Sequence, residues 1–302
     1  MFVGSLISEL KSSLLEIRLI NADGHQIVIS QRQEGHHYRI RLADGYVYAL
    51  TNRRQSDYEL AVARLEQLND WTYYETPPGT IRDFEILGKA VVLLIEDHLI
   101  STLYELRPPG DLSTLLTSSQ AETISLSTNQ DPGSNQVRII RSGPHVPDQV
   151  EVIDLLTGER KTLPDTSSPV TSQRIARQEW YKSRDGTWVP MTWLEPPRTP
   201  NPPPVLITSY GAYGVPLNRA YQPQWGPLLD RGFAVVQIHV RGGGELREHA
   251  QVAQEAPRAR AAAVGAGGEG GDGLGPRRRR SVAVRGAVRG PVRVAVRGAG
   301  TS

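Results

Sequence analysis

The chain has 302 residues with a formal net charge of +2, and 38% of its residues are hydrophobic. The absence of cysteine excludes a disulfide framework and a thiolate metal site. No apolar run approaches the roughly 20 residues needed to span a bilayer, and the N-terminus lacks the basic, apolar and small-residue regions of a signal peptide. These features predict a cytoplasmic protein that associates with neither a membrane nor a metal.

Residues 1–165 contain short apolar or alternating runs separated by turn residues, a pattern typical of antiparallel hairpins. The clearest hairpin signal is Asp44-Gly45 between two alternating runs, because both residues of such a turn need positive φ. Larger units of roughly 40–45 residues begin near His36, Thr80 and Ala121, which is the length of a four-stranded propeller blade. We expect a partial β-propeller of about 3.5 blades, with a single antiparallel sandwich as the alternative.

A linker rich in Pro, Ser and Thr spans residues 164–176, and the pattern changes after it, within a second domain that we place at residues 166–250. A hairpin with Asp185-Gly186 at its turn comes first. VLITS (Val205–Ser209) and FAVVQIHV (Phe233–Val240) are continuous apolar runs of the kind buried on both faces of a parallel sheet. Between them, QPQWGPLLDRG predicts a short helix that ends at Gly232. Strand, helix and strand in this order predict an α/β domain.

Two glycine-containing motifs follow these two strands, SYGAYG (Ser209–Gly214) and RGGGE (Arg241–Glu245). The carboxyl ends of strands are where open α/β sheets bind ligands, and glycines let the backbone approach a substrate closely. A plain tight turn is the alternative for each motif. A phosphate loop is disfavoured because neither motif has the P-loop or dinucleotide-binding glycine spacing. His239 lies within a strand, and we interpret it as a packed core residue.

The order of the propeller-like region, SRDGTWVP, SYGAYG, LLDRGF and IHVRGGGEL resembles the prolyl oligopeptidase family of serine peptidases (S9). The run from SYGAYG to RGGGEL is most similar to the oligopeptidase B (protease II) branch. The resemblance extends from near residue 1 to about Leu246. It implies a β-propeller that caps an α/β-hydrolase domain, short peptides as substrates, cleavage after basic residues, and no cofactor.

Carried over by position, the resemblance implies that Tyr210 helps to form an oxyanion hole. It places Tyr213 in the substrate pocket, and Arg241 and Glu245 in a loop that shapes the site. The family's catalytic Ser lies in a G-x-S-x-G turn, which this sequence does not contain. No histidine follows His249, so the Ser, Asp and His of the triad are absent and the chain is expected to be inactive.

Residues 251–302 contain ten arginines and three acidic residues, and they lack Phe, Tyr, Trp, Ile and Met. This composition predicts a disordered tail, because it offers too little apolar surface to offset the entropy of ordering. It is also what GC-rich DNA encodes when it is read out of frame. We therefore hypothesise a frameshift between about Leu246 and Gln251; a native low-complexity tail is the alternative.

Three functions follow as hypotheses. The first is a fragment of a serine oligopeptidase that acts on short peptides. The second is a non-enzymatic propeller module that binds peptides or partners. The third is non-specific polyanion binding by the arginines of the tail, with no specific nucleic acid as partner. The sequence predicts no particular oligomeric state.

Overall fold

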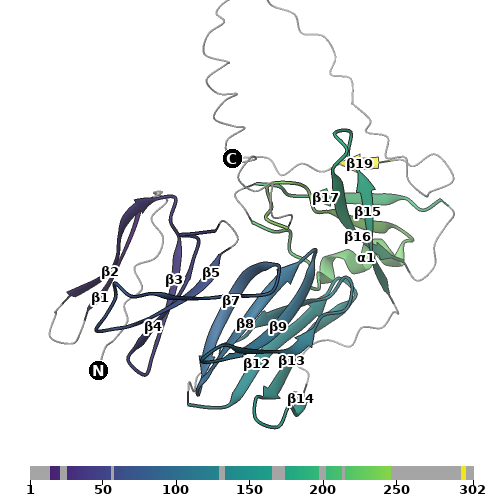
Figure 1. The fold of residues 1–302 in the computed structure, drawn as a ribbon. Helices are drawn as coiled ribbons and strands as arrows, with labels where there is room; N and C mark the ends of the chain where they lie inside the picture. Colours follow the sequence, from purple (N-terminus) through teal and green to yellow (C-terminus); the bar gives the residue numbers. More distant parts are fainter. Residues whose placement is uncertain are drawn as a thin grey trace, which may run out of the picture.

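The structure is a computed structural model that describes residues 14–20, 26–55, 58–128, 133–164, 174–196, 202–212, 215–245 and 294–296. Most of these residues are in strands (Figure 1). A two-stranded sheet comes first, three four-stranded antiparallel sheets follow, and a five-stranded mixed sheet comes last. No helix in the described ranges is long and apolar enough to cross a membrane.

The antiparallel sheets are meanders in which each strand pairs with its neighbours in sequence. The two-stranded sheet consists of β1 (Leu14–Ile20) and β2 (Gln26–Glu34). The four-stranded sheets are β3 (Tyr38–Ala43), β4 (Tyr46–Thr51), β5 (Glu59–Arg64) and β6 (Thr72–Tyr74); β7 (Thr80–Leu87), β8 (Ala90–Asp97), β9 (Ile100–Arg107) and β10 (Asp111–Thr117); and β11 (Thr123–Leu126), β12 (Gln136–Gly143), β13 (Val146–Asp154) and β14 (Arg160–Thr162). The first strand of each four-stranded sheet (β3, β7 and β11) begins close to one of the three predicted unit starts. This agreement confirms the predicted partial propeller.

The turn between β3 and β4 has the predicted hairpin geometry. Asp44 and Gly45 adopt φ values of 48° and 77°, so both central residues lie in the left-handed region. This turn leads Ala43 directly into pairing with Tyr46, and the register continues without a bulge to Tyr38 and Thr51. The local sequence therefore determines the pairing of the first complete sheet.

The core lies between successive sheets. One apolar cluster joins β4 and β5 to β7, β8 and β9, and a second joins β7, β8 and β9 to β11, β12 and β13. Strand β8 serves both clusters, because Val91, Leu93 and Ile95 face the first and Ala90, Val92 and Leu94 face the second. Burial on both faces explains why its sequence is apolar without alternation. A stack of sheets with a core in each interface excludes the single-sandwich alternative (Figure 1).

The mixed sheet has the order β15-β16-β18-β17-β19. Its strands are β15 (Ile175–Lys182), β16 (Trp188–Glu195), β17 (Val205–Ser209), β18 (Ala234–Ile238) and β19 (Val294–Val296). β15 and β16 form the predicted hairpin, and β17 and β18 are the predicted parallel pair. The connection contains a 3-10 turn, η1 (Pro223–Trp225), and the helix α1 (Gly226–Asp230). Trp225 and Leu229 pack on Leu194 and Val235, and this contact fixes the helix to the sheet.

One short segment of residues 251–302, the tail that we predict to be disordered, forms a strand in the structure. β19 pairs in parallel with β17, with Val294 opposite Val205 and Val296 opposite Ile207. A Val-Ala-Val run has strong strand propensity, and the outer side of β17 offers unpaired backbone groups to any such run. The other residues of the predicted tail lie outside the described residues.

Candidate functional site

The two glycine-containing loops meet at the carboxyl ends of strands β17 and β18 of the mixed sheet. β17 and β18 are adjacent and parallel, and Ser209 pairs with Ile238 at their carboxyl ends. A Cβ added to Gly211 would overlap the side chain of Val240 and lie 2.7 Å from the carbonyl oxygen of Arg241. The loop after β17 therefore contacts the chain after β18, and only glycine allows this approach.

Tyr210 lies at this meeting point, directly after β17. It is 42% exposed and is therefore partly accessible to solvent at the carboxyl end of the parallel strands. Such a position is compatible with the predicted donation of a hydrogen bond to an oxyanion. Tyr213 lies outside the described residues, and its predicted place in a substrate pocket stays a prediction.

Arg241 contacts the turn of the β15–β16 hairpin. Its guanidinium Nη1 lies 2.5 Å from Oδ2 of Asp185, and both side chains are partly exposed. The backbone N–H of Thr187 donates to the other oxygen of the same carboxylate at 3.1 Å. This N–H first, and then the Arg241 guanidinium, lower the pKa of Asp185 to about 2. The ion pair ties the glycine-rich loop to the hairpin.

Glu245 lies inside the protein, with only 1% of its side chain exposed. Its Oε1 accepts a hydrogen bond of 2.8 Å from the backbone N–H of Leu217. The ring of His239 lies close to the same carboxylate oxygen, with its Nδ1 3.5 Å from Oε1 of Glu245. The carboxylate also occupies the space that a side chain on Gly243 would need. Glu245 therefore fastens the glycine-rich loop to the chain that follows the tyrosine loop.

His239 is completely buried, which confirms its interpretation as a packed core residue. Its backbone N–H donates to Pro190 at 3.0 Å, and its Nε2 lies 2.9 Å from the hydroxyl oxygen of Thr192. His239 therefore fills the space next to Glu245, and its Nδ1 makes no hydrogen bond to a described residue.

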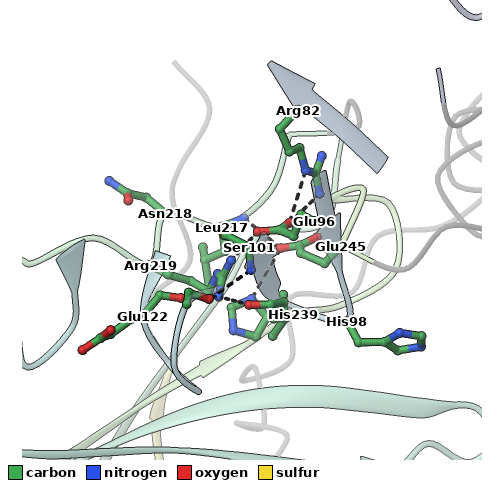
Figure 2. Close-up of polar contacts among 12 residues, drawn as sticks. Arg82, Glu96, His98, Ser101, Glu122, Leu217, Asn218, Arg219, His239 and Glu245 are labelled. Carbon is green, nitrogen blue, oxygen red and sulfur yellow. Dashed lines mark hydrogen bonds and ion pairs between the residues drawn. The ribbon is translucent and has the colours of Figure 1, made fainter. Parts of the chain in front are cut away.

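A buried ion-pair cluster lies next to these loops (Figure 2). Glu96, at the end of β8, is contacted by two arginines, Arg82 from β7 and Arg219 from the segment before η1. Arg82 Nη2 lies 2.7 Å from Oε1 of Glu96, and Arg219 Nη2 contacts Oε2. Arg82 Nη2 also donates to the carbonyl oxygen of Gly244 at 2.9 Å. The cluster thus joins a propeller sheet to the glycine-rich loop.

The electrostatics of Glu96 follow from this geometry. Burial alone would raise its pKa, but the charges of Arg219 and Arg82, together with their hydrogen bonds, outweigh burial and hold the pKa below its usual range. Arg219 is itself only 5% exposed, and its Nη1 donates to the carbonyl oxygens of Leu99 at 2.5 Å and Glu122 at 3.3 Å. Two backbone acceptors and one carboxylate therefore satisfy this buried cation.

We call residues 215–222 the bridging segment, because its residues form hydrogen bonds with strands of different sheets. The Tyr221 N–H donates to Ser142 Oγ of β12 at 3.0 Å. Gln237 of β18 donates through Nε2 to the carbonyl oxygen of Asn218 at 2.7 Å. With the bonds of Leu217 and Arg219, the segment connects the mixed sheet to two of the propeller sheets.

Sequence patterns did not reveal this junction. Arg82 and Gly244 are separated by 162 positions, and Arg219 and Glu96 by 123. Arg219 and Glu96 have neither a motif nor a spacing that would distinguish them from surface charges. In the described ranges no group of three His, Asp or Glu side chains could hold a metal ion.

No family model matches the chain. A protein of Xenopus laevis named "Prolyl endopeptidase-like" is 27% identical over 252 residues, which is 80% of this chain and 36% of that protein. "Protease 2" of Moraxella lacunata is 30% identical over 142 residues, which is 45% of this chain and 21% of that protein. This chain is thus related in sequence to proteins named as prolyl endopeptidase-like and as a protease. It spans about a third or less of the length of these curated relatives.

Solved structures show a similar fold. Oligopeptidase B of Trypanosoma brucei, determined with covalently bound antipain, superimposes with a TM-score of 0.70 at 22% identity. The match covers 78% of this chain and 37% of that one. The antiparallel sheets described above thus match the propeller of a prolyl oligopeptidase family peptidase, as the sequence motifs implied.

Proposed function

We propose that this chain is part of a serine oligopeptidase of the prolyl oligopeptidase family. In this proposal residues 1–165 form part of the propeller cap, and residues 166–250 form the first strands of an α/β-hydrolase domain. The observation that supports it most is the contact of the tyrosine loop with the glycine-rich loop at the carboxyl ends of β17 and β18. Open α/β sheets bind their substrates at this place.

The proposed chemistry is acyl transfer by an activated serine. Attack of the serine on a peptide carbonyl places negative charge on the carbonyl oxygen, and a histidine general base takes the serine proton. Tyr210 would donate a hydrogen bond from its hydroxyl to that oxygen; its partial exposure directly after β17 supports this role. Arg241 and Tyr213 would shape the substrate side of the site, and the buried Glu245 would hold the glycine-rich loop in place behind it. No cofactor takes part.

The serine, aspartate and histidine of such a triad have no counterpart in this sequence. We therefore propose that the chain as given does not turn over peptides. Its Ala/Gly/Arg tail would result from a frameshift near residues 246–251, and the in-frame enzyme would cleave short peptides after basic residues. The lack of cysteine supports a cytoplasmic location.

The first experiment is to sequence the coding DNA across codons 240–260 and to read all three frames downstream. The proposal expects one frame to continue into a tryptophan-containing helix and a G-x-S-x-G motif. If no frame contains the motif, the peptidase proposal fails and the chain is better explained as a propeller module that binds peptides or partners.

The second experiment compares two purified proteins, the chain as given and the product of the continued frame. Each is incubated with a fluorophosphonate probe and with peptides that contain either Arg or Pro before the scissile bond. Labelling and turnover are expected only for the continued product, with Arg peptides preferred. Labelling of the chain as given would contradict its inactivity, and a preference for Pro would contradict the proposed specificity.

A further inference from the structure

We infer that Glu96 of the propeller is a positioning residue that, through its two arginines, holds the glycine-rich loop of the proposed site and the bridging segment that follows the tyrosine loop. The inference rests on the proposed function only in treating these loops as parts of a peptidase site. Glu96 belongs to propeller strand β8, but the inference gives its side chain a positioning role in the α/β part of the molecule. Figure 2 shows Arg82 and Arg219 contacting its carboxylate.

The first connection leads to the glycine-rich loop. Arg82 Nη2 bonds Oε1 of Glu96 at 2.7 Å and the carbonyl oxygen of Gly244 at 2.9 Å. The carboxylate therefore orients the guanidinium that binds the loop. Gly244 adopts a φ of 82° and precedes Glu245, whose Oε1 accepts from Leu217. A shift of Gly244 would move Glu245 away from this N–H.

The second connection leads to the bridging segment, which follows the tyrosine loop in the chain. Arg219 lies in the middle of this segment and contacts Oε2 of Glu96, so one carboxylate binds both arginines. The same guanidinium binds two propeller carbonyl oxygens, those of Leu99 and Glu122. The segment is thus held by the propeller on one side and by Glu245 on the other.

The two connections converge on amide hydrogens that can be observed directly. The Leu217 N–H reports the bond between the bridging segment and the glycine-rich loop. The Tyr221 N–H reports the bond between the bridging segment and Ser142 of β12. An isosteric Glu96→Gln substitution keeps the shape of the side chain but removes the charge that both arginines need.

Hydrogen exchange of the full chain, resolved to single amides by fragmentation mass spectrometry, tests the inference. Glu105→Gln is the matched control, because Glu105 is also buried and paired, but its partner Arg107 lies on the same strand β9. Glu96→Gln should accelerate exchange at both reporter amides by about tenfold or more, whereas Glu105→Gln should leave them unchanged. Arg82→Met should accelerate exchange at Leu217 more than at Tyr221.

Two results would overturn the inference. One is that Glu96→Gln changes the reporter amides no more than Glu105→Gln does. The other is that exchange rises equally at the reporter amides and in the centres of β8 and β18, which would indicate a general loss of stability. The exchange experiment measures no turnover, so a negative result there does not contradict the proposed function. Conversely, if no reading frame contains G-x-S-x-G, the role inferred for Glu96 in holding the glycine-rich loop and the bridging segment is not contradicted.

Discussion

Removal of the Arg219 guanidinium should destabilise the junction between the mixed sheet and the propeller more than any surface ion pair does. Arg219→Met keeps the aliphatic stem but leaves Glu96 with a single arginine and removes the donor for the Leu99 carbonyl. Deleting one partner of a buried pair costs about 3–5 kcal/mol. This free-energy cost already includes the buried hydrogen-bond acceptors that lose their donor, each of which costs about 1–3 kcal/mol.

The matched control is Arg177→Met on the mixed sheet. Arg177 contacts two carboxylates, those of Glu179 and Glu195, but 45% of its side chain is exposed. Pairs of this kind contribute about 0–1 kcal/mol. Arg219 contacts a single carboxylate but is buried, so a larger loss for Arg219→Met than for Arg177→Met would follow from burial and not from the number of acidic partners.

The assay is urea denaturation followed by tryptophan fluorescence. Four of the five tryptophans lie in the mixed sheet or in η1, so the signal reports this part of the molecule: Trp180, Trp188, Trp193 and Trp225. Arg219→Met should lower the free energy of unfolding by about 3–5 kcal/mol and Arg177→Met by less than about 1 kcal/mol. Equal losses for the two variants would refute the reasoning that burial makes the Arg219 contacts strong.

Three further predictions follow from the same contacts. Tyr210→Phe in the continued enzyme should lower kcat about 10²–10³-fold with little change in KM, as measured with an Arg peptide, and Tyr73→Phe in the propeller should change neither. Gly211→Ala places a Cβ against Val240 and the Arg241 carbonyl, and it should lower the melting temperature through about 1–3 kcal/mol of overpacking. The pKa of Glu96 is lowered in the folded state, so its stabilising contribution is complete above the ordinary range near 4.5 and is lost as the pH falls through the folded pKa. The difference in unfolding free energy between the wild type and Glu96→Gln should therefore shrink as the pH falls below 4.5; a difference that stays constant down to pH 3 would contradict this assignment.

Much of the fold could be predicted from the sequence because its determinants are local. Asp44-Gly45 needs positive φ at both turn residues, and the repeat of short strands places each four-stranded sheet within one continuous stretch of chain. The apolar runs at Val205–Ser209 and Ala234–Ile238 have the composition of strands buried on both faces. The resemblance then indicated which loops to consider, and the comparisons found peptidases similar to this chain in sequence and in fold.

The sequence alone did not determine what surrounds those loops. Arg241 pairs with the hairpin turn at Asp185, and Glu245 is buried against His239. The positions of Arg82, Glu96 and Arg219 in one cluster depend on how the sheets pack. Charge patterns along a chain record only neighbours in sequence, whereas burial between sheets removes water from charges that are distant in sequence. Only the tertiary structure therefore decides which of the many arginines and glutamates hold the site together.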